Sequence, residues 1–297
     1  EIASCLVGSE MCIRDRSNVE RTMKALLLFL LFVVSQVVAG LLSILFSQQS
    51  RLGQGVSLES LTVQPIAMGT AMFVVDCLLC VGLALWFYRL EPRWKQLTAP
   101  PLEDAFVWKS QRPRLRQIFF AVLAATLLAF GLSLVLEPFH LSDNGMQAQF
   151  DAMKYHPLCV LLLVLVGPLT EELIFRAGIV RYLRQRHLPS WLAAAVAALA
   201  FAVVHQNWAQ AVPAFVIGWI FGLFYLRTGN LSLCLPAHIA NNLFALGVMY
   251  FPQVFHFMEE WSAGALFALG ALHIGLGLLN VRRALRPTSS SPLTPTL

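Results

Sequence analysis

The chain has 297 residues, of which 58% are hydrophobic and only 12% are charged, and its mean hydropathy is +0.68. This composition lies outside the range of soluble domains and is typical of a polytopic membrane protein. The net charge of +5 does not indicate nucleic acid, because Lys and Arg fall in the gaps between apolar runs, where they set orientation in a bilayer. We therefore expect an all-α integral membrane fold, with the lipid bilayer as a partner and no nucleic-acid partner.

Residues 1–22 precede the first apolar run. They begin with "EIASCLVGSEMCIRDRS", which has no initiator Met and no apolar pattern, and which resembles translated adapter sequence. We expect 1–22 to be a non-native or disordered segment outside the fold. A start at Met23 would place Lys24 directly before an apolar segment of ~22 residues, long enough for a retained membrane helix.

Apolar runs of about 20 residues, the length that crosses ~30 Å of hydrocarbon, divide the rest of the chain into about eight predicted spans. In chain order they cover residues 25–46, 66–88, 118–136, 157–183, 191–206, 211–226, 231–251 and 261–280. They predict a single membrane domain over residues 24–286. Residues 287–297, rich in Pro, Ser and Thr, are expected to form a disordered tail.

Basic residues collect on alternate sides of these spans. The connection 89–117 is rich in Lys and Arg, and the fourth, sixth and eighth spans also end in basic residues. The opposite connections carry few charges or mainly acidic ones. Since Lys and Arg favour the cytoplasmic side, we predict that both termini are cytoplasmic. The compact chain suggests a bacterial cytoplasmic membrane.

Polar side chains interrupt three of the predicted spans. Each ionisable group at membrane depth costs at least ~2.5 kcal/mol and usually faces a bundle interior or a polar cavity. At ~1.5 Å per helical residue, their depths of about 11 to 21 Å from the cytoplasmic side allow them to share one layer. They are Glu171, Glu172 and Arg176 in the fourth span, His205 in the fifth, and His238, Asn241 and Asn242 in the seventh.

The spacing gives these residues different expected roles. Glu172 and Arg176 are four residues apart, on one helix face, and are expected to neutralise each other. Glu171 is rotated by about 100° from Glu172, which leaves its carboxylate free for chemistry. His238 and Asn242, also four apart, can face the same point.

Three motifs resemble those of the CPBP family of intramembrane proteases, also called the CAAX-protease and bacteriocin-processing or Abi family. The family pattern is EExxxR, FxxxH and HxxxN on separate membrane helices. This sequence has "EELIFR" at 171–176, "FAVVH" at 201–205 and "HIANN" at 238–242, in the same order, within a motif core at 157–251. The resemblance implies an endopeptidase of the type that cleaves prenylated proteins, acting on membrane-associated or lipid-modified peptides.

The resemblance also implies roles for individual residues. Glu171 with His205 would activate the attacking water, and His238 with Asn242 would stabilise the tetrahedral oxyanion. Glu172 and Arg176, with Phe201 beneath the His205 ring, would support this site.

A metal-dependent version would use some of the same residues. Glu171, His205 and His238 could hold Zn²⁺ with an open position for water, and the family is often labelled as metalloendopeptidase. The chain has no HExxH motif, however, and Asn242 is a poor zinc ligand. We favour a mechanism without a cofactor, while Zn²⁺ stays the alternative.

Two other functional classes compete with a protease. A transporter would use Glu, Arg and His within the membrane as a proton relay or substrate site, but the sequence has no visible inverted repeat. A catalytically inactive immunity or scaffold protein would bind a partner helix. Detection of a cleaved product separates the protease from both alternatives.

Overall fold

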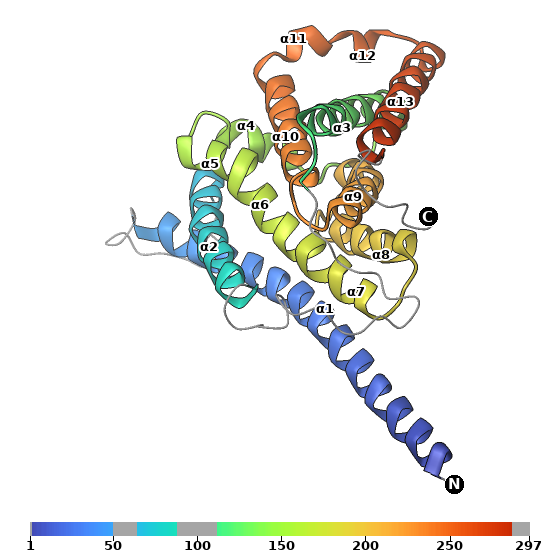
Figure 1. Ribbon diagram of the computed structural model, residues 1–297. Coiled ribbons are helices and arrows are strands. Elements are labelled where there is room, and N and C mark those ends of the chain that lie inside the picture. Colours follow the sequence, from blue (N-terminus) through green and yellow to red (C-terminus); the bar gives the residue numbers. More distant parts are fainter. Residues whose placement is uncertain (1, 50–63, 88–111, 287–297) are drawn as a thin grey trace.

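The computed structural model describes residues 2–49, 64–87 and 112–286. Over these ranges the chain forms helices joined by turns, with no strand, as Figure 1 shows. The all-α membrane fold predicted from the composition is confirmed. The tail 287–297, and most of the basic connection 89–117, lie outside the described residues.

The helices follow one another closely along the chain, and two segments, η5 and η6, have the wider turns of a π-helix. In order, the elements are α1 (Ile2–Gln49), α2 (Pro65–Leu85), α3 (Leu115–Leu136), the 3₁₀ turn η4 (Glu137–Phe139), α4 (Met146–Met153), α5 (Pro157–Leu161), η5 (Leu162–Val166), α6 (Gly167–Glu171), η6 (Glu172–Val180), α7 (Arg181–Gln185), α8 (Ser190–Val203), α9 (Trp208–Thr228), α10 (Cys234–Tyr250), α11 (Pro252–Phe255), α12 (Phe257–Glu260) and α13 (Ala263–Leu285).

Each of the eight apolar segments predicted from the sequence contains a helix, but not all of these helices are long enough to cross a bilayer. Among the described residues six pass that test, and the total is seven if α10 and its continuation, bent by 97° at Phe251, count as one span. The remaining helix, α8, has 14 residues. At ~1.5 Å per residue it is about 21 Å long, short of the ~30 Å hydrocarbon core.

Helix α1 begins at Ile2, so residues 2–22 continue into the apolar part of this helix, which covers Asn18–Ser47. The expectation that residues 1–22 are foreign to the fold stays a prediction. The sidedness of the spans, with both termini cytoplasmic, also stays a prediction.

A central rod made of α5, η5, α6, η6 and α7 runs through the bundle (Figure 1). It packs against α1 and α2 on one side and against α8, α9 and α10 on the other. The largest buried apolar cluster surrounds η6 and includes Phe175, Phe221 and Phe224. The rod therefore carries its polar side chains into the largest buried apolar cluster of the described residues.

Helices α3 and α13 form the most extensive helix pair among the described residues, and small residues let their backbones approach. A Cβ atom added at Gly131 would lie 2.9 Å from the carbonyl oxygen of Gly270. Helix α10 packs against α3, so this pair supports the helix that carries His238.

Candidate active site

The central rod is distorted on both sides of its first glutamate. Pro168, the second residue of α6, has no backbone N–H to donate, and the N–H of Gly167 bonds to the carbonyl of Leu162, five residues back. π-Helical turns are rare and frequently occur at functional sites. Here η5 ends just before α6 begins, and η6 begins directly after Glu171, the last residue of α6.

Glu172 and Arg176 form a buried ion pair, as their spacing predicts. Arg176 Nη1 lies 2.9 Å from Glu172 Oε1, and the two side chains are 1% and 0% exposed. Arg176 Nη2 also donates to the carbonyl of Gly218 at 3.2 Å, and its guanidinium lies 4.6 Å from the centre of the Phe201 ring. A buried charge pair is stable only when such additional contacts offset its desolvation.

His238 joins the two adjacent carboxylates. Its Nδ1 lies 2.8 Å from Glu172 Oε1, and its Nε2 lies 3.4 Å from Glu171 Oε2. Because a carboxylate accepts hydrogen bonds, Nδ1 carries the proton that faces Glu172. The Nε2 side of the ring therefore faces Glu171, whose side chain is 22% exposed while that of Glu172 is fully buried.

His205 follows the last turn of α8, and Phe201 holds its imidazole. Nδ1 of His205 donates to the carbonyl of Phe201 at 2.8 Å, which leaves Nε2 as the free ring nitrogen. The Phe201 ring lies 4.8 Å from the His205 ring, at nearly a right angle, and 5.9 Å from the His238 ring. Among the described residues no hydrogen bond links His205 to Glu171, so their pairing stays a prediction.

Asn242 lies one turn after His238 on α10 and reaches the central rod. Its amide nitrogen donates to the carbonyl of Leu163, within η5, at 2.8 Å, and its amide oxygen accepts from the Asn241 side chain at 3.2 Å. The amide nitrogen has a second N–H. One N–H of Asn242 therefore binds the rod, and the described residues give no acceptor for the other.

Gly218 is part of the site although it has no side chain. A Cβ atom there would lie 3.0 Å from Phe201 Cδ1 and 3.1 Å from Arg176 Nη2. The sequence contains a signal for this close contact, since Gly218 and Gly222 form the small-xxx-small pattern that lets membrane helices approach.

We expect Gly218→Val to destabilise the protein by about 1–3 kcal/mol, the usual effect of overpacking a close contact. The added methyl groups would push Arg176 and Phe201 away from their partners. Gly247→Val is the matched control, because a Cβ atom at Gly247 meets nothing within 4 Å. Thermal unfolding in detergent measures both, and equal unfolding temperatures would contradict this assignment.

Asp76 is a buried acidic side chain beside the site, on α2. It is 3% exposed and lies 3.4 Å from the Gln36 amide nitrogen. Thr170, the residue before Glu171, lies 3.0 Å from Cys80 through its hydroxyl. The first contact joins α2 to α1, and the second joins α2 to the rod one residue before Glu171. The sequence signal for this part of the site was Asp76, an acidic residue in the middle of an apolar span.

The possible zinc ligands do not gather in one place. No group of three or more His, Cys, Asp or Glu in the described ranges has the geometry to hold a metal ion. Glu171 and His238 approach each other, while among the described residues the His205 ring contacts Phe201. The set Glu171, His205 and His238 does not fit a metal in this arrangement, and we derive no step through one.

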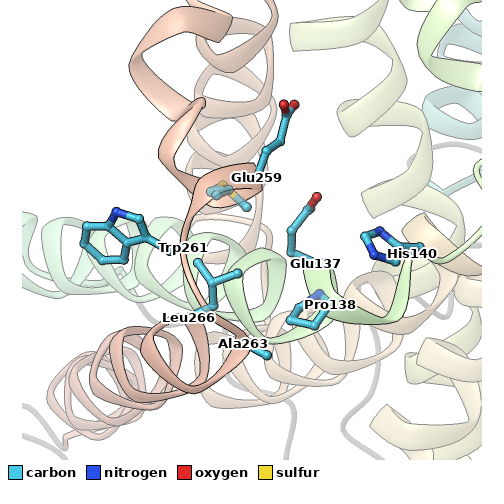
Figure 2. A pocket seen from close by; sticks show the side chains of 8 residues that line it. Glu137, Pro138, His140, Glu259, Trp261, Ala263 and Leu266 are labelled. Carbon is cyan, nitrogen blue, oxygen red and sulfur yellow. The ribbon is translucent and has the colours of Figure 1, made fainter.

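A pocket of about 500 Å³ lies where α3 ends and α13 begins. It is separate from the cluster around Glu171 and His238. Figure 2 shows Glu137, His140 and Trp261 around it. None of Glu171, Glu172, His205, His238 and Asn242 lines it.

Comparisons with known proteins match the middle of the chain. Residues 154–244, which include all three motifs, match the family model described as type II CAAX prenyl endopeptidase Rce1-like. This segment contains Glu171, Glu172, His205, His238 and Asn242.

Relatives from Bacillus subtilis (strain 168) also match. "Putative membrane peptidase YdiL" is 24% identical over 156 residues, 52% of this chain and 63% of that protein. "Uncharacterized protein YyaK" is 30% identical over 141 residues, 43% of this chain and 46% of that protein. The chain thus spans less than two thirds of either relative. No solved structure matches.

Proposed function

Because the chain belongs to the CPBP or CAAX-protease family, of the Rce1-like type, we propose that it is an intramembrane endopeptidase. Its substrates are membrane-associated or lipid-modified peptides. The observation that carries the proposal is the cluster in which His238 contacts Glu171 and Glu172 while Arg176 neutralises Glu172. This arrangement leaves one partly exposed carboxylate beside an imidazole, inside an apolar bundle.

The proposed reaction begins with water. Glu171, with His205, takes a proton from a water molecule as its oxygen attacks the carbonyl carbon of the peptide bond. The carbonyl oxygen becomes an oxyanion, which is stabilised by the second N–H of Asn242 and by the Nε2–H of a doubly protonated His238, whose Nδ1–H stays bonded to Glu172. When the C–N bond breaks, the proton held by the base passes to the leaving amine. Preorganised donors lower the barrier most where water is scarce.

Glu172 and Arg176 have a supporting role in this proposal. Glu172 accepts from Nδ1 of His238 and so fixes which ring nitrogen faces the reacting groups. Arg176 holds Glu172 in place through the ion pair and itself bonds to Gly218. The pair therefore acts through His238 and does not contact the substrate.

We also propose a location and a sidedness. The protein lies in a bacterial cytoplasmic membrane with both termini in the cytoplasm. Basic residues on alternate connections support this proposal.

The test uses the purified full chain in lipid vesicles, with two synthetic peptides that share one membrane helix and one polar tail. One peptide carries a prenyl thioether on a cysteine of the tail, and the other does not. We expect a cleaved product from at least one peptide, detected by mass spectrometry, and retained activity after chelator treatment. Activity lost with bound Zn²⁺ and restored with it would contradict the favoured metal-independent mechanism.

A folded protein that cleaves neither peptide, nor any component of the membrane proteome of its host, would contradict the proposed peptidase. The inactive scaffold would then be the better account. Ion or solute flux across the same vesicles would instead support the transporter.

A further inference from the structure

The turn between α8 and α9, residues 204–207, is held by more contacts than a helix connection needs. Gln206 has a φ of 57°, in the left-handed region that non-glycine residues rarely occupy. Asn207, which is only 5% exposed, donates from its amide nitrogen to the carbonyl of His205 at 2.8 Å. The strained turn thus has a buried side chain bound to the backbone of His205.

A second asparagine holds the same turn from a distant part of the chain. Asn144, in the connection between η4 and α4, donates to the carbonyl of Gln206 at 2.7 Å. Ser142 donates to the amide oxygen of Asn144 at 2.9 Å, and the carbonyl of Ser142 accepts from the N–H of Ala209 at 3.3 Å. The connection therefore contacts both sides of the turn.

The connection itself is ordered by a local carboxylate. Asp143 accepts from the backbone N–H groups of Gln147 and Gly145. These two bonds hold the pKa of the Asp143 carboxyl below its usual value.

Asn207 has two separable tasks. Its amide oxygen caps α9 by accepting from the N–H of Gln210 at 2.8 Å. A helix cap requires only such an oxygen, and Asp serves there as well as Asn. The amide nitrogen donates to the His205 carbonyl and also to Gln210 Oε1 at 3.0 Å, and both bonds are additional to the cap.

We propose that Asn207 and Asn144 are positioning residues for His205. They fix the carbonyl groups of His205 and Gln206, and so keep the imidazole within reach of the Phe201 carbonyl that holds its Nδ1–H. The free Nε2 is thereby held in one place relative to Glu171 and His238. The inference rests on the proposed function to the extent that His205 takes part in the reaction.

The decisive variant is Asn207→Asp, which keeps the capping oxygen and replaces the donating nitrogen with an oxygen that repels the His205 carbonyl. We expect kcat to fall by about 10- to 100-fold, because a small misplacement of a catalytic group has effects of this size. KM and the unfolding temperature should stay close to those of the unchanged protein. Asn144→Ala should act in the same direction.

The matched control is Asn230→Asp in the turn between α9 and α10. Asn230 likewise accepts a backbone N–H, from Ser232 at 2.9 Å, and donates to a backbone carbonyl, of Thr228 at 3.2 Å. It lies at the opposite end of α9 from His205. We expect full activity from this control, and an equal loss from both variants would overturn the proposal.

A second readout does not depend on activity. In protein labelled with ¹⁵N at histidine, His205→Ala assigns the imidazole signals of His205. We expect one tautomer, protonated at Nδ1, in the unchanged protein and a mixture of both tautomers in Asn207→Asp. Unchanged signals would overturn the positioning role. If the unchanged protein cleaves nothing, the proposed function fails, and these signals alone decide the positioning.

Discussion

Glu172→Gln is expected to destabilise the protein by about 3–5 kcal/mol, because it leaves Arg176 charged and unpaired in a fully buried place. The same change weakens the bond that His238 donates to Glu172. The loss corresponds to a fall in unfolding temperature on the order of 10 °C. Thermal unfolding of the purified protein in detergent measures it.

Two variants control this result. Glu171→Gln changes the neighbouring carboxylate, which is partly exposed and 3.4 Å from its imidazole partner, and should leave the unfolding temperature nearly unchanged. Glu172→Gln with Arg176→Met removes both charges and should recover much of the stability without restoring turnover. An unfolding temperature that falls with Glu171→Gln and not with Glu172→Gln would exchange the roles of the two glutamates.

Glu171→Gln should reduce kcat by about 10²- to 10⁴-fold, the range expected when a general base is removed. Gln keeps the shape of the side chain, so KM should change little. Steady-state cleavage of a membrane peptide in vesicles measures both constants. Glu259→Gln, at a side chain that is 72% exposed, is the matched control and should keep full activity. A Glu171→Gln protein with more than half the normal kcat would contradict the role of Glu171 as base.

Part of this site could be predicted from the sequence. The spacing of Glu172 and Arg176 was enough to predict their ion pair, because residues four apart share a helix face. Their pair forms even though η6 is a π-helix, which the sequence did not indicate beyond the proline at position 168.

Contacts between helices could not be predicted in the same way. His238 reaches both glutamates because of the rotation and depth of α10, and these depend on packing against the central rod and α3. Gly218 contributes through the absence of a side chain, so its importance appears only when Arg176 and Phe201 are placed beside it. Similarly, Asn144 lies 62 residues before the Gln206 carbonyl it binds.

The apolar segments themselves were predictable, and their lengths were less so. Each of the eight apolar segments contains a helix among the described residues, because burial in lipid requires continuous apolar runs. Hydropathy did not show that α8 ends at Val203, where the turn that carries His205 begins. Gln206 adopts a left-handed backbone conformation and Asn207 caps the next helix. The apolar run therefore ends in a tight turn, and α8 does not extend further.

The most direct test of the central claim is cleavage of a membrane peptide in water enriched in ¹⁸O. If Glu171 and its neighbours activate water, the N-terminal product should carry one ¹⁸O atom in its new carboxylate, and Glu171→Gln vesicles should yield almost none. Products formed equally by Glu171→Gln, or products without ¹⁸O, would contradict water activation at this cluster.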